Sequence, residues 1–271
     1  MNITLPARQG DVFSWGVQIF HEPLWMAFAV VTMVVSALAH GVLGFGFPLI
    51  STPVIALVAD MQTAVLLTVL PNLAVNLVSI VRGGQWQESL GRYWPIAIWV
   101  LLGTLLGTRV LLSMDPAPLK ILLALMIAIY LAQERLKRLD WSFIARHPHA
   151  SGLVLGLFAG VLSGSVNVSL PPLVIYFMAL GLNPLAMTQI LNLCFLAGKS
   201  AQAGAFALAG HFDGDALWIS LPLTLLSVST LVVGMRLRRN MNPDLYRKLV
   251  FWSLGIIATL LAGQGLAPLL G

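Results

Sequence analysis

The stretch HGVLGFGFP, residues 40–48, interrupts an otherwise apolar part of the chain. A second stretch, SGSVN at residues 163–167, does the same shortly before Pro171 and Pro172. Glycine and proline disfavour a continuous helix, so each stretch predicts a break between two shorter helices. Inside a membrane, non-helical backbone is tolerated only where protein or water satisfies its polar groups. We therefore expect both breaks to line a site inside the protein.

The composition places these breaks in a membrane protein. Of the 271 residues, 58% are hydrophobic and 9% are charged, whereas a soluble domain carries about 25% charged residues. So few charges cannot cover a protein surface in water, which indicates several membrane-spanning helices. The net charge of +5 does not predict nucleic-acid binding, because the basic residues cluster between apolar segments. The lone Cys194 excludes an intrachain disulfide.

The hydropathy predicts an all-α, polytopic membrane fold with ten apolar segments. A bilayer core of about 30 Å needs roughly 20 helical residues. The second, sixth and seventh segments are shorter, which predicts broken or re-entrant helices there. The first 23 residues lack the basic start and apolar core of a cleaved signal peptide, so we expect the first segment to be retained. The segments are residues 24–43, 48–59, 61–81, 95–113, 117–133, 151–164, 171–180, 185–208, 216–235 and 245–263.

Matching residues indicate that one unit occurs twice in the chain. Gly41 and Gly160 are 119 residues apart, and Asn72 and Asn192 are 120 apart. Proline, asparagine and arginine matches in the same order rarely arise by chance in a chain rich in Leu, Ala and Val. We predict a single transmembrane domain over residues 1–271, with repeats at 24–134 and 150–263 and a basic linker at 134–149. Further matches are Pro53 with Pro172, Thr68 with Thr188, Ser79 with Lys199, Gly107-Thr-Arg109 with Gly234-Met-Arg236, and Met114-Asp115-Pro116 with Met241-Asn242-Pro243.

The two repeats are predicted to have opposite orientations in the membrane. Each contains five segments, an odd number, so the second is expected to be inverted relative to the first. Four crossings separate the basic linker from the basic region 236–248, which puts both on the cytoplasmic side. The loop at 211–215 carries Asp213 and Asp215 and falls on the outer side, as do both termini.

The motifs together resemble one transporter family. The glycine-rich break at 40–48, its echo at 160–172 and the repeated Gly-x-Arg before Met-Asp/Asn-Pro are similar to the TauE/SafE sulfite exporters. The resemblance covers nearly the whole chain. It implies a multi-pass secondary carrier of the bacterial inner membrane for small sulfur-containing anions, such as sulfite or organosulfonates like sulfoacetate. Phe45 and Phe47 depart from the family's small residues in the first break, and Ser-Val-Asn replaces a glycine run in the second. Both departures would alter the volume of the binding pocket that the resemblance implies.

The breaks themselves carry the chemistry of an anion site. A helix that begins inside the membrane presents free N–H groups and a positive dipole end. The short helices are expected to begin at Pro48 or Pro53 and at Pro171 or Pro172, and Thr52 and Ser169 are candidate N-caps. Ordinary kinks are the alternative interpretation. The candidate substrate-binding residues are His40, Gly44, Phe45, Gly46, Phe47, Pro48, Asn72, Asn76, Ser163, Ser165, Asn167, Pro171, Asn192, Lys199 and Gln202.

Polar residues recur along one face of two matching segments. The stripe in the first repeat consists of Thr68, Asn72, Asn76, Ser79 and Arg82, and the one in the second consists of Thr188 or Gln189, Asn192, Lys199 and Gln202. Such a face is costly against lipid, so it should meet protein or water. Hydrogen bonds between helices would account for it as well as a ligand would.

Lys199 lies in the middle of its segment, so its side chain could reach the membrane–water interface only in a strained conformation. A buried ammonium requires a counter-charge. Asp60, at a segment edge, is one candidate. The substrate anion itself is the other.

The sequence also bears on proton coupling of transport and on functions other than a sulfur-anion carrier. His40 could couple transport to protons, bind the anion as imidazolium, or simply be satisfied by a nearby carbonyl. The stretch GVLSG at 160–164 loosely suggests a serine nucleophile, yet no apolar segment downstream supplies a histidine base. No paired carboxylates, phosphate-binding loop or metal-ligand spacing occurs, so neither an enzyme nor a cofactor is predicted. An anion channel and a carrier of small carboxylates remain alternative functions.

Overall fold

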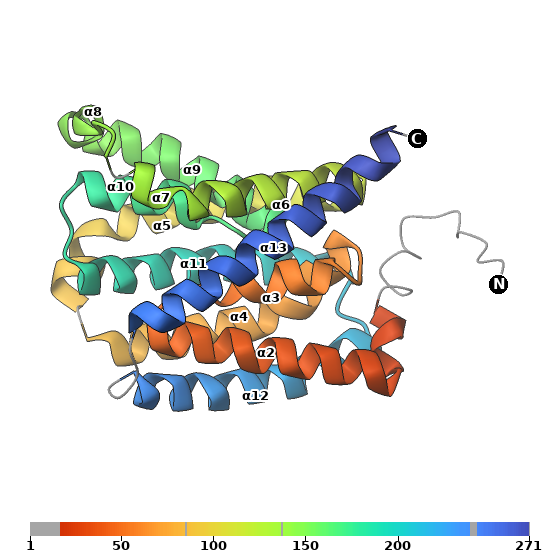
Figure 1. The fold of residues 1–271 in the computed structure, drawn as a ribbon. Helices are drawn as coiled ribbons and strands as arrows, with labels where there is room; N and C mark the ends of the chain where they lie inside the picture. Colours follow the sequence, from red (N-terminus) through yellow and green to blue (C-terminus); the bar gives the residue numbers. More distant parts are fainter. Residues whose placement is uncertain (1–16, 85, 137, 239–242, 271) are drawn as a thin grey trace.

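The computed structural model describes residues 17–84, 86–136, 138–238 and 243–270 (Figure 1). Most of the region on which the signal-peptide expectation rests, residues 1–16, lies outside these ranges. So do Lys137 and Arg239 of the two basic loops. The described residues are 88% helical and contain no strand, and the predicted all-α polytopic fold is confirmed.

Ten principal helices correspond one to one with the ten predicted segments. Proline opens several of them, because a residue without an N–H loses nothing in the first turn. The helices are α2 (Pro23–Leu43), α3 (Phe47–Ala56), α4 (Met61–Gly83), α5 (Gly91–Ser113), α6 (Pro116–Leu131), α9 (Pro148–Val166), α10 (Leu170–Ala179), α11 (Pro184–Leu208), α12 (Gly214–Leu237) and α13 (Pro243–Leu270). Short elements are η1 (Ile19–His21), the π-helical η2 (Trp86–Leu90), α7 (Gln133–Leu136) and α8 (Ser142–Arg146).

Within the described part of the chain, six helices are long and apolar enough to cross a membrane: α2, α4, α5, α9, α12 and residues 248–268 of α13. The prediction that the sixth segment is too short is wrong. Its helix α9 runs from Pro148 to Val166 and spans 19 residues, because it begins in the polar end of the linker and ends two residues beyond the predicted segment. Helices α3 and α10 have 10 residues each, so the second and seventh segments are short as predicted.

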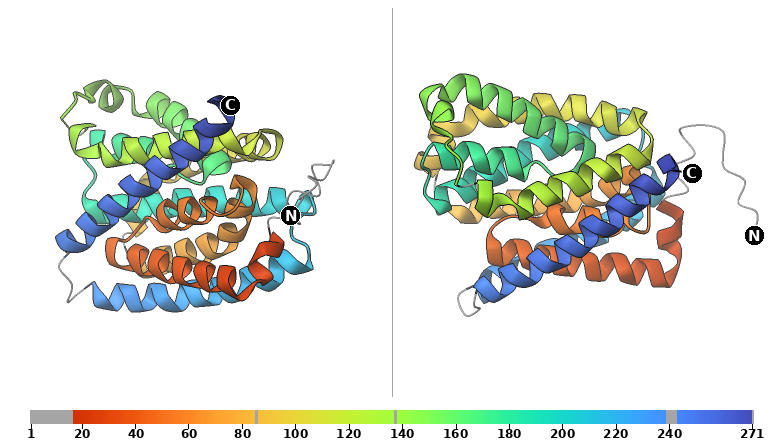
Figure 2. Two further views of the ribbon diagram at one scale, coloured as in Figure 1. Left: turned by 45° about the vertical axis from the view of Figure 1, so that its right-hand side comes forward. Right: turned by 45° about the horizontal axis from the view of Figure 1, so that its top comes forward.

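The long helices run side by side across the view of Figure 1, and α13 crosses obliquely over them (Figures 1 and 2). Helix α3 lies inside this array, with nearly every residue buried. Its backbone groups are shielded from lipid by the surrounding helices, as a half-length helix at membrane depth requires. The helices on either side of each break therefore meet inside the protein.

Close glycine contacts join helices from different parts of the chain. Gly103 of α5 faces Gly160 of α9, and a Cβ at Gly160 would lie 2.8 Å from the Cα of Gly103. Gly41 of α2 faces Gly234 of α12, and a Cβ at Gly41 would lie 2.6 Å from the carbonyl oxygen of Leu231. Small residues let membrane helices approach closely and gain van der Waals contact. These two seams fix α5 against α9 and α2 against α12.

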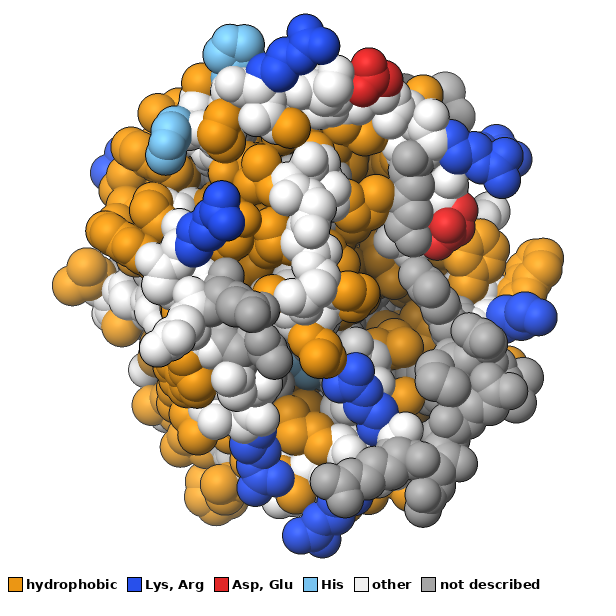
Figure 3. Space-filling view, turned by 90° about the vertical axis from the view of Figure 1, so that its left-hand side faces the viewer, with side chains coloured by type: hydrophobic (Ala, Val, Ile, Leu, Met, Phe, Trp, Pro, Cys, Tyr) orange, Lys and Arg blue, Asp and Glu red, His pale blue; other side chains and the backbone are white. Residues whose placement is uncertain are grey.

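One end of the helix array is strongly basic. The segment between α6 and α9 and the end of α12 lie at this end, at the left of Figure 1. Lys and Arg side chains surround the face in Figure 3, which looks onto it. Basic loops mark the cytoplasmic side of a membrane protein, so we refer to this end as the cytoplasmic end. The loop between α11 and α12, with Asp213 and Asp215, lies at the other end.

Candidate functional site

The first break depends on two glycines. Gly44 and Gly46 have φ angles of 88° and 106°, in the left-handed region that favours glycine. The first turn of α3 holds few free donors. The N–H of Phe47 donates to Nδ1 of His40 at 3.4 Å, Pro48 has no N–H, and the N–H of Leu49 donates to the Gly46 carbonyl at 3.1 Å.

The second break is held by Asn167, whose φ of 61° is also left-handed. Asparagine tolerates this region better than most residues. Its side-chain Nδ2 crosses to the first half of the chain and donates to Oγ1 of Thr52 at 2.6 Å and of Thr68 at 3.0 Å. Helix α10 then starts with Pro171 and Pro172 in its first turn, so two of its first N–H groups do not exist.

The predicted N-caps are only partly correct. Thr52 is not a cap, because it lies in the second turn of α3 and its hydroxyl meets Asn167 instead. Gly46 occupies the N-cap position of α3. Ser169 does occupy the N-cap position of α10, but its side chain makes no capping hydrogen bond.

The asparagines of α4 and α11 each reach the break of the opposite half. Nδ2 of Asn72 donates to Oδ1 of Asn167 at 3.5 Å, and Nδ2 of Asn192 donates to the carbonyl of Gly44 at 2.9 Å. Asn76 extends the first contact by donating to Oδ1 of Asn72 at 2.7 Å. Two buried acceptors in this part of the structure, Oδ1 of Asn76 and of Asn192, lack a hydrogen-bond partner. A buried unpaired amide oxygen is costly, and of the two residues Asn192 lines the polar cavity described below.

Lys199 is buried in α11, with 1% of its surface exposed. Its Nζ donates to the carbonyl of Ser163 at 3.0 Å and to Oε1 of Gln202. Nε2 of Gln202 in turn donates to the carbonyl of Gly164 at 2.8 Å. These acceptors are neutral, and among the described residues no carboxylate lies within ion-pair distance of this Nζ. The ammonium is therefore not neutralised by the protein around it.

Asp60 is not the partner of Lys199. Its Oδ1 accepts the N–H of Thr63 at 2.7 Å and its Oδ2 accepts the Thr63 hydroxyl at 2.8 Å. The carboxylate caps the start of α4, where a negative charge also meets the positive end of the helix dipole. The segment-edge position that suggested a counter-charge is thus explained by helix capping.

A polar cavity of about 570 Å³ opens between the ends of α2, α4, α11 and α12. Ser79 on its wall is hydrogen-bonded to Nε2 of the buried His40 at 3.0 Å, so the cavity ends against the first break. Three arginines at the cytoplasmic end give the cavity a positive lining. The lining residues are Gly41, Gly44, Ser79, Arg82, Gly83, Leu185, Thr188, Gln189, Asn192, Met235, Arg236 and Arg238.

Several predicted site residues face away from this cavity. Phe45 and Gly46 line a small recess with Tyr130 and Val250 on the α6 and α13 side. Pro171 lines an apolar groove, described below. The Ser165 hydroxyl donates to its own helix, at the Val161 carbonyl, over 2.7 Å. Phe47 and Pro48 are buried.

The cavity includes residues outside the predicted set: Ser79, Arg82, Thr188, Gln189, Arg236 and Arg238. Ser79 and Arg82 continue the helical stripe begun by Asn72 and Asn76, so that spacing was an available signal. Arg236 belongs to the repeated Gly-x-Arg motif. Arg238 carries no comparable signal, because only the packing of α12 brings it to the cavity.

The fold and site define a polytopic helical membrane protein in which two interrupted helices meet inside the molecule beside a basic cavity. A family model described as sulfite exporter TauE/SafE matches residues 28–261, most of the chain. The chain therefore belongs to this family, whose members are membrane exporters of sulfur anions rather than enzymes. A search of curated proteins and a search of solved structures found no match.

Proposed function

We propose that the chain is a secondary carrier of the bacterial inner membrane for sulfite or for small organosulfonates such as sulfoacetate. The observation that carries this proposal is a cationic cavity that ends at the first break, where Asn192 binds the Gly44 carbonyl. Arg82, Arg236 and Arg238 line its wall, and Asn192 lies at its inner end. Guanidinium groups bind oxyanions through paired hydrogen bonds and raise their local concentration.

Side chains, rather than helix N-termini, supply most donors in this proposal. The first turns of α3 and α10 contain few free N–H groups, as described above. Deeper along α11 from Asn192, the ammonium of Lys199 lies without an acidic partner. An anion that moves inward from the cavity supplies the counter-charge that Lys199 lacks. The attraction between the two charges offsets the cost of dehydrating the anion.

Alternating access between the two ends would complete the transport cycle. The cavity is open at the cytoplasmic end, between α2, α4, α11 and α12. The residues around Lys199 are closed in by the tight seam of α5 and α9, where glycines bring the two backbones together. Separation of that seam would expose Lys199 to the opposite side. Rocking of one bundle against another is a common way for carriers to achieve this.

Counterflow in proteoliposomes tests the proposal. Uptake of labelled sulfite and of labelled sulfoacetate would be measured with and without unlabelled anion inside the vesicles. We expect internal sulfite or sulfoacetate to accelerate uptake, because a loaded carrier returns more readily than an empty one. Flux that ignores internal anion would favour a channel. Acceleration by a small carboxylate, with none by either sulfur anion, would overturn the substrate assignment.

A further inference from the structure

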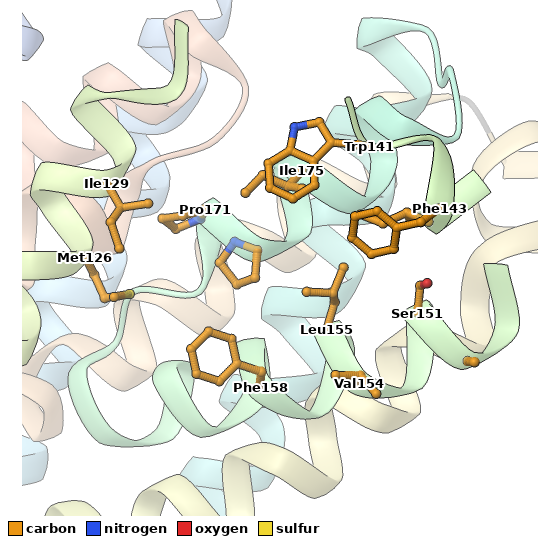
Figure 4. Close-up of a pocket in the computed structure, with 13 residues that line it drawn as sticks. Met126, Ile129, Trp141, Phe143, Ser151, Val154, Leu155, Phe158, Pro171 and Ile175 are labelled. Carbon is orange, nitrogen blue, oxygen red and sulfur yellow. The ribbon is translucent and has the colours of Figure 1, made fainter. Parts of the chain in front are cut away.

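A second large cavity lies away from the basic cavity and is almost wholly apolar. It has a volume of about 470 Å³ and lies between α6, α8, α9 and α10 (Figure 4). Ser151 is the one polar side chain among its lining residues. The lining residues are Met126, Ile129, Trp141, Phe143, Ile144, Ala150, Ser151, Val154, Leu155, Phe158, Pro171, Pro172 and Ile175. We call it the α9 groove.

The groove is open on its outer side and elongated along α9. Val154, Phe158 and Phe143 line it yet keep 61%, 50% and 56% of their surfaces exposed. Its α9 residues run from Ala150 to Phe158 at helical spacing, and eight residues of helix rise about 12 Å. It therefore starts beside α8 at the cytoplasmic end and extends inward toward the second break.

The end of the groove beside α8 carries positive charge. Arg146 lies on the same short helix as two groove residues, Phe143 and Ile144, and is exposed. Arg135 and Arg138 are exposed in the segment just before it. The segment also carries two exposed acidic residues, Glu134 and Asp140, the second of which caps α8 through Ser142; the three arginines still leave this end with a net positive charge.

We propose that the α9 groove binds one acyl chain of an anionic phospholipid, with the headgroup phosphate held by Arg135, Arg138 and Arg146. An unfilled apolar groove forfeits dispersion contacts, and acyl chains are what surround this surface in a bilayer. Basic side chains at the cytoplasmic interface select anionic headgroups. Met126 and Ile129 of α6 form one wall of the groove, and α9 and α10 form the opposite wall. The bound acyl chain would therefore bridge the two halves of the molecule.

Native mass spectrometry tests this inference without reference to transport. The purified full chain would be released from nanodiscs containing equal amounts of phosphatidylglycerol and phosphatidylethanolamine. We expect wild-type protein to retain one phosphatidylglycerol. Val154→Trp fills the groove and should reduce the retained fraction about tenfold, which corresponds to a modest change in binding free energy. Val31→Trp on α2 is the matched control, because Val31 is also 61% exposed but lies outside the groove.

Charge variants test the headgroup assignment separately. The triple variant Arg135→Gln, Arg138→Gln, Arg146→Gln should still retain a phospholipid but lose the preference for phosphatidylglycerol. Arg109→Gln, on an exposed residue of α5, should keep that preference. Equal retention by Val154→Trp and Val31→Trp would overturn the site, as would wild-type protein without bound lipid. A dimer that Val154→Trp dissociates would assign the groove to a second copy instead.

Discussion

Lys199 and Ser79 lie 120 residues apart, at positions that the predicted repeats match, but have different surroundings. Ser79 borders the open cavity and binds His40 of α2, whereas Lys199 is enclosed and binds the Ser163 carbonyl of α9. Each side chain therefore connects a long polar helix to the helix that precedes a break. Ser79 makes this connection in the first half with a neutral hydrogen bond, whereas Lys199 makes it in the second half with a positively charged group.

Replacement of Lys199 tests whether that charge serves the anion. Lys199→Gln should weaken sulfite affinity at least about tenfold, because it removes the full charge that an anion would meet. The loss should exceed that of Asn72→Ala or Asn192→Ala. Binding to the purified protein would be measured together with the unfolding temperature, so that misfolding is recognised.

Lys120→Gln provides the control for this experiment. Lys120 donates to Oε1 of Gln264 at 2.8 Å near the surface of α6, away from the polar breaks. Its replacement should leave anion affinity unchanged. Unaltered affinity in Lys199→Gln would refute the role of Lys199, and its carbonyl contacts would then be purely structural.

At the scale of the element, hydropathy predicts most of the fold because each helix must be apolar enough to face lipid or the core. The ten segments match the ten principal helices for this reason. The start of α9 was misjudged because His149 resembles the polar linker, although it already belongs to a helix that begins at Pro148.

The site was harder to predict than the helices. Asn72, Asn192 and Lys199 stand out because polar side chains are rare at membrane depth, and all three prove to be buried. Thr52 could not be placed from local sequence. Its partner Asn167 is 115 residues away, and only the packing of α3 beside the second break brings them together. The cavity arginines likewise depend on where helices end in space.

The glycine seam between α5 and α9 supports a prediction about stability. Gly160→Ala should destabilise the protein by about 1–3 kcal/mol, because the added Cβ meets the backbone of α5, which cannot move aside cheaply. Gly204→Ala on α11 is the control. A Cβ there meets nothing within 4 Å, so the change should stabilise its helix by about 0.5–1 kcal/mol. Unfolding temperatures in detergent would check both, and equal temperatures would show that the seam tolerates extra volume.

At the scale of the whole molecule, we propose that the two predicted repeats are related by a pseudo-two-fold axis. The pairing of helices supports this. Helix α5 packs on α9 as α12 packs on α2, α11 packs on α5 as α4 packs on α12, and α6 packs on α13. Each pairing maps onto another, or onto itself, when the halves are exchanged. Both seams are closed at their glycines, so the difference lies at the helix ends: the cavity at the end of α12 and the buried region at the end of α5 are then equivalent places in different states.

This relation predicts which residues change accessibility during transport. Met235 lines the open cavity, and its match in the first half, Thr108, is buried at the closed seam. In a Cys194→Ala background, Met235→Cys should react with a membrane-impermeant maleimide from the cytoplasmic side, whereas Thr108→Cys should not react from either side. If the cavity and the seam exchange roles, a transported anion should slow labelling of Met235→Cys and open Thr108→Cys to the reagent from the outer side. The single cysteines would be labelled in inside-out and right-side-out vesicles, with and without sulfite. Simultaneous labelling of both sites without an anion would indicate a continuous pore, because a carrier closes one end before it opens the other.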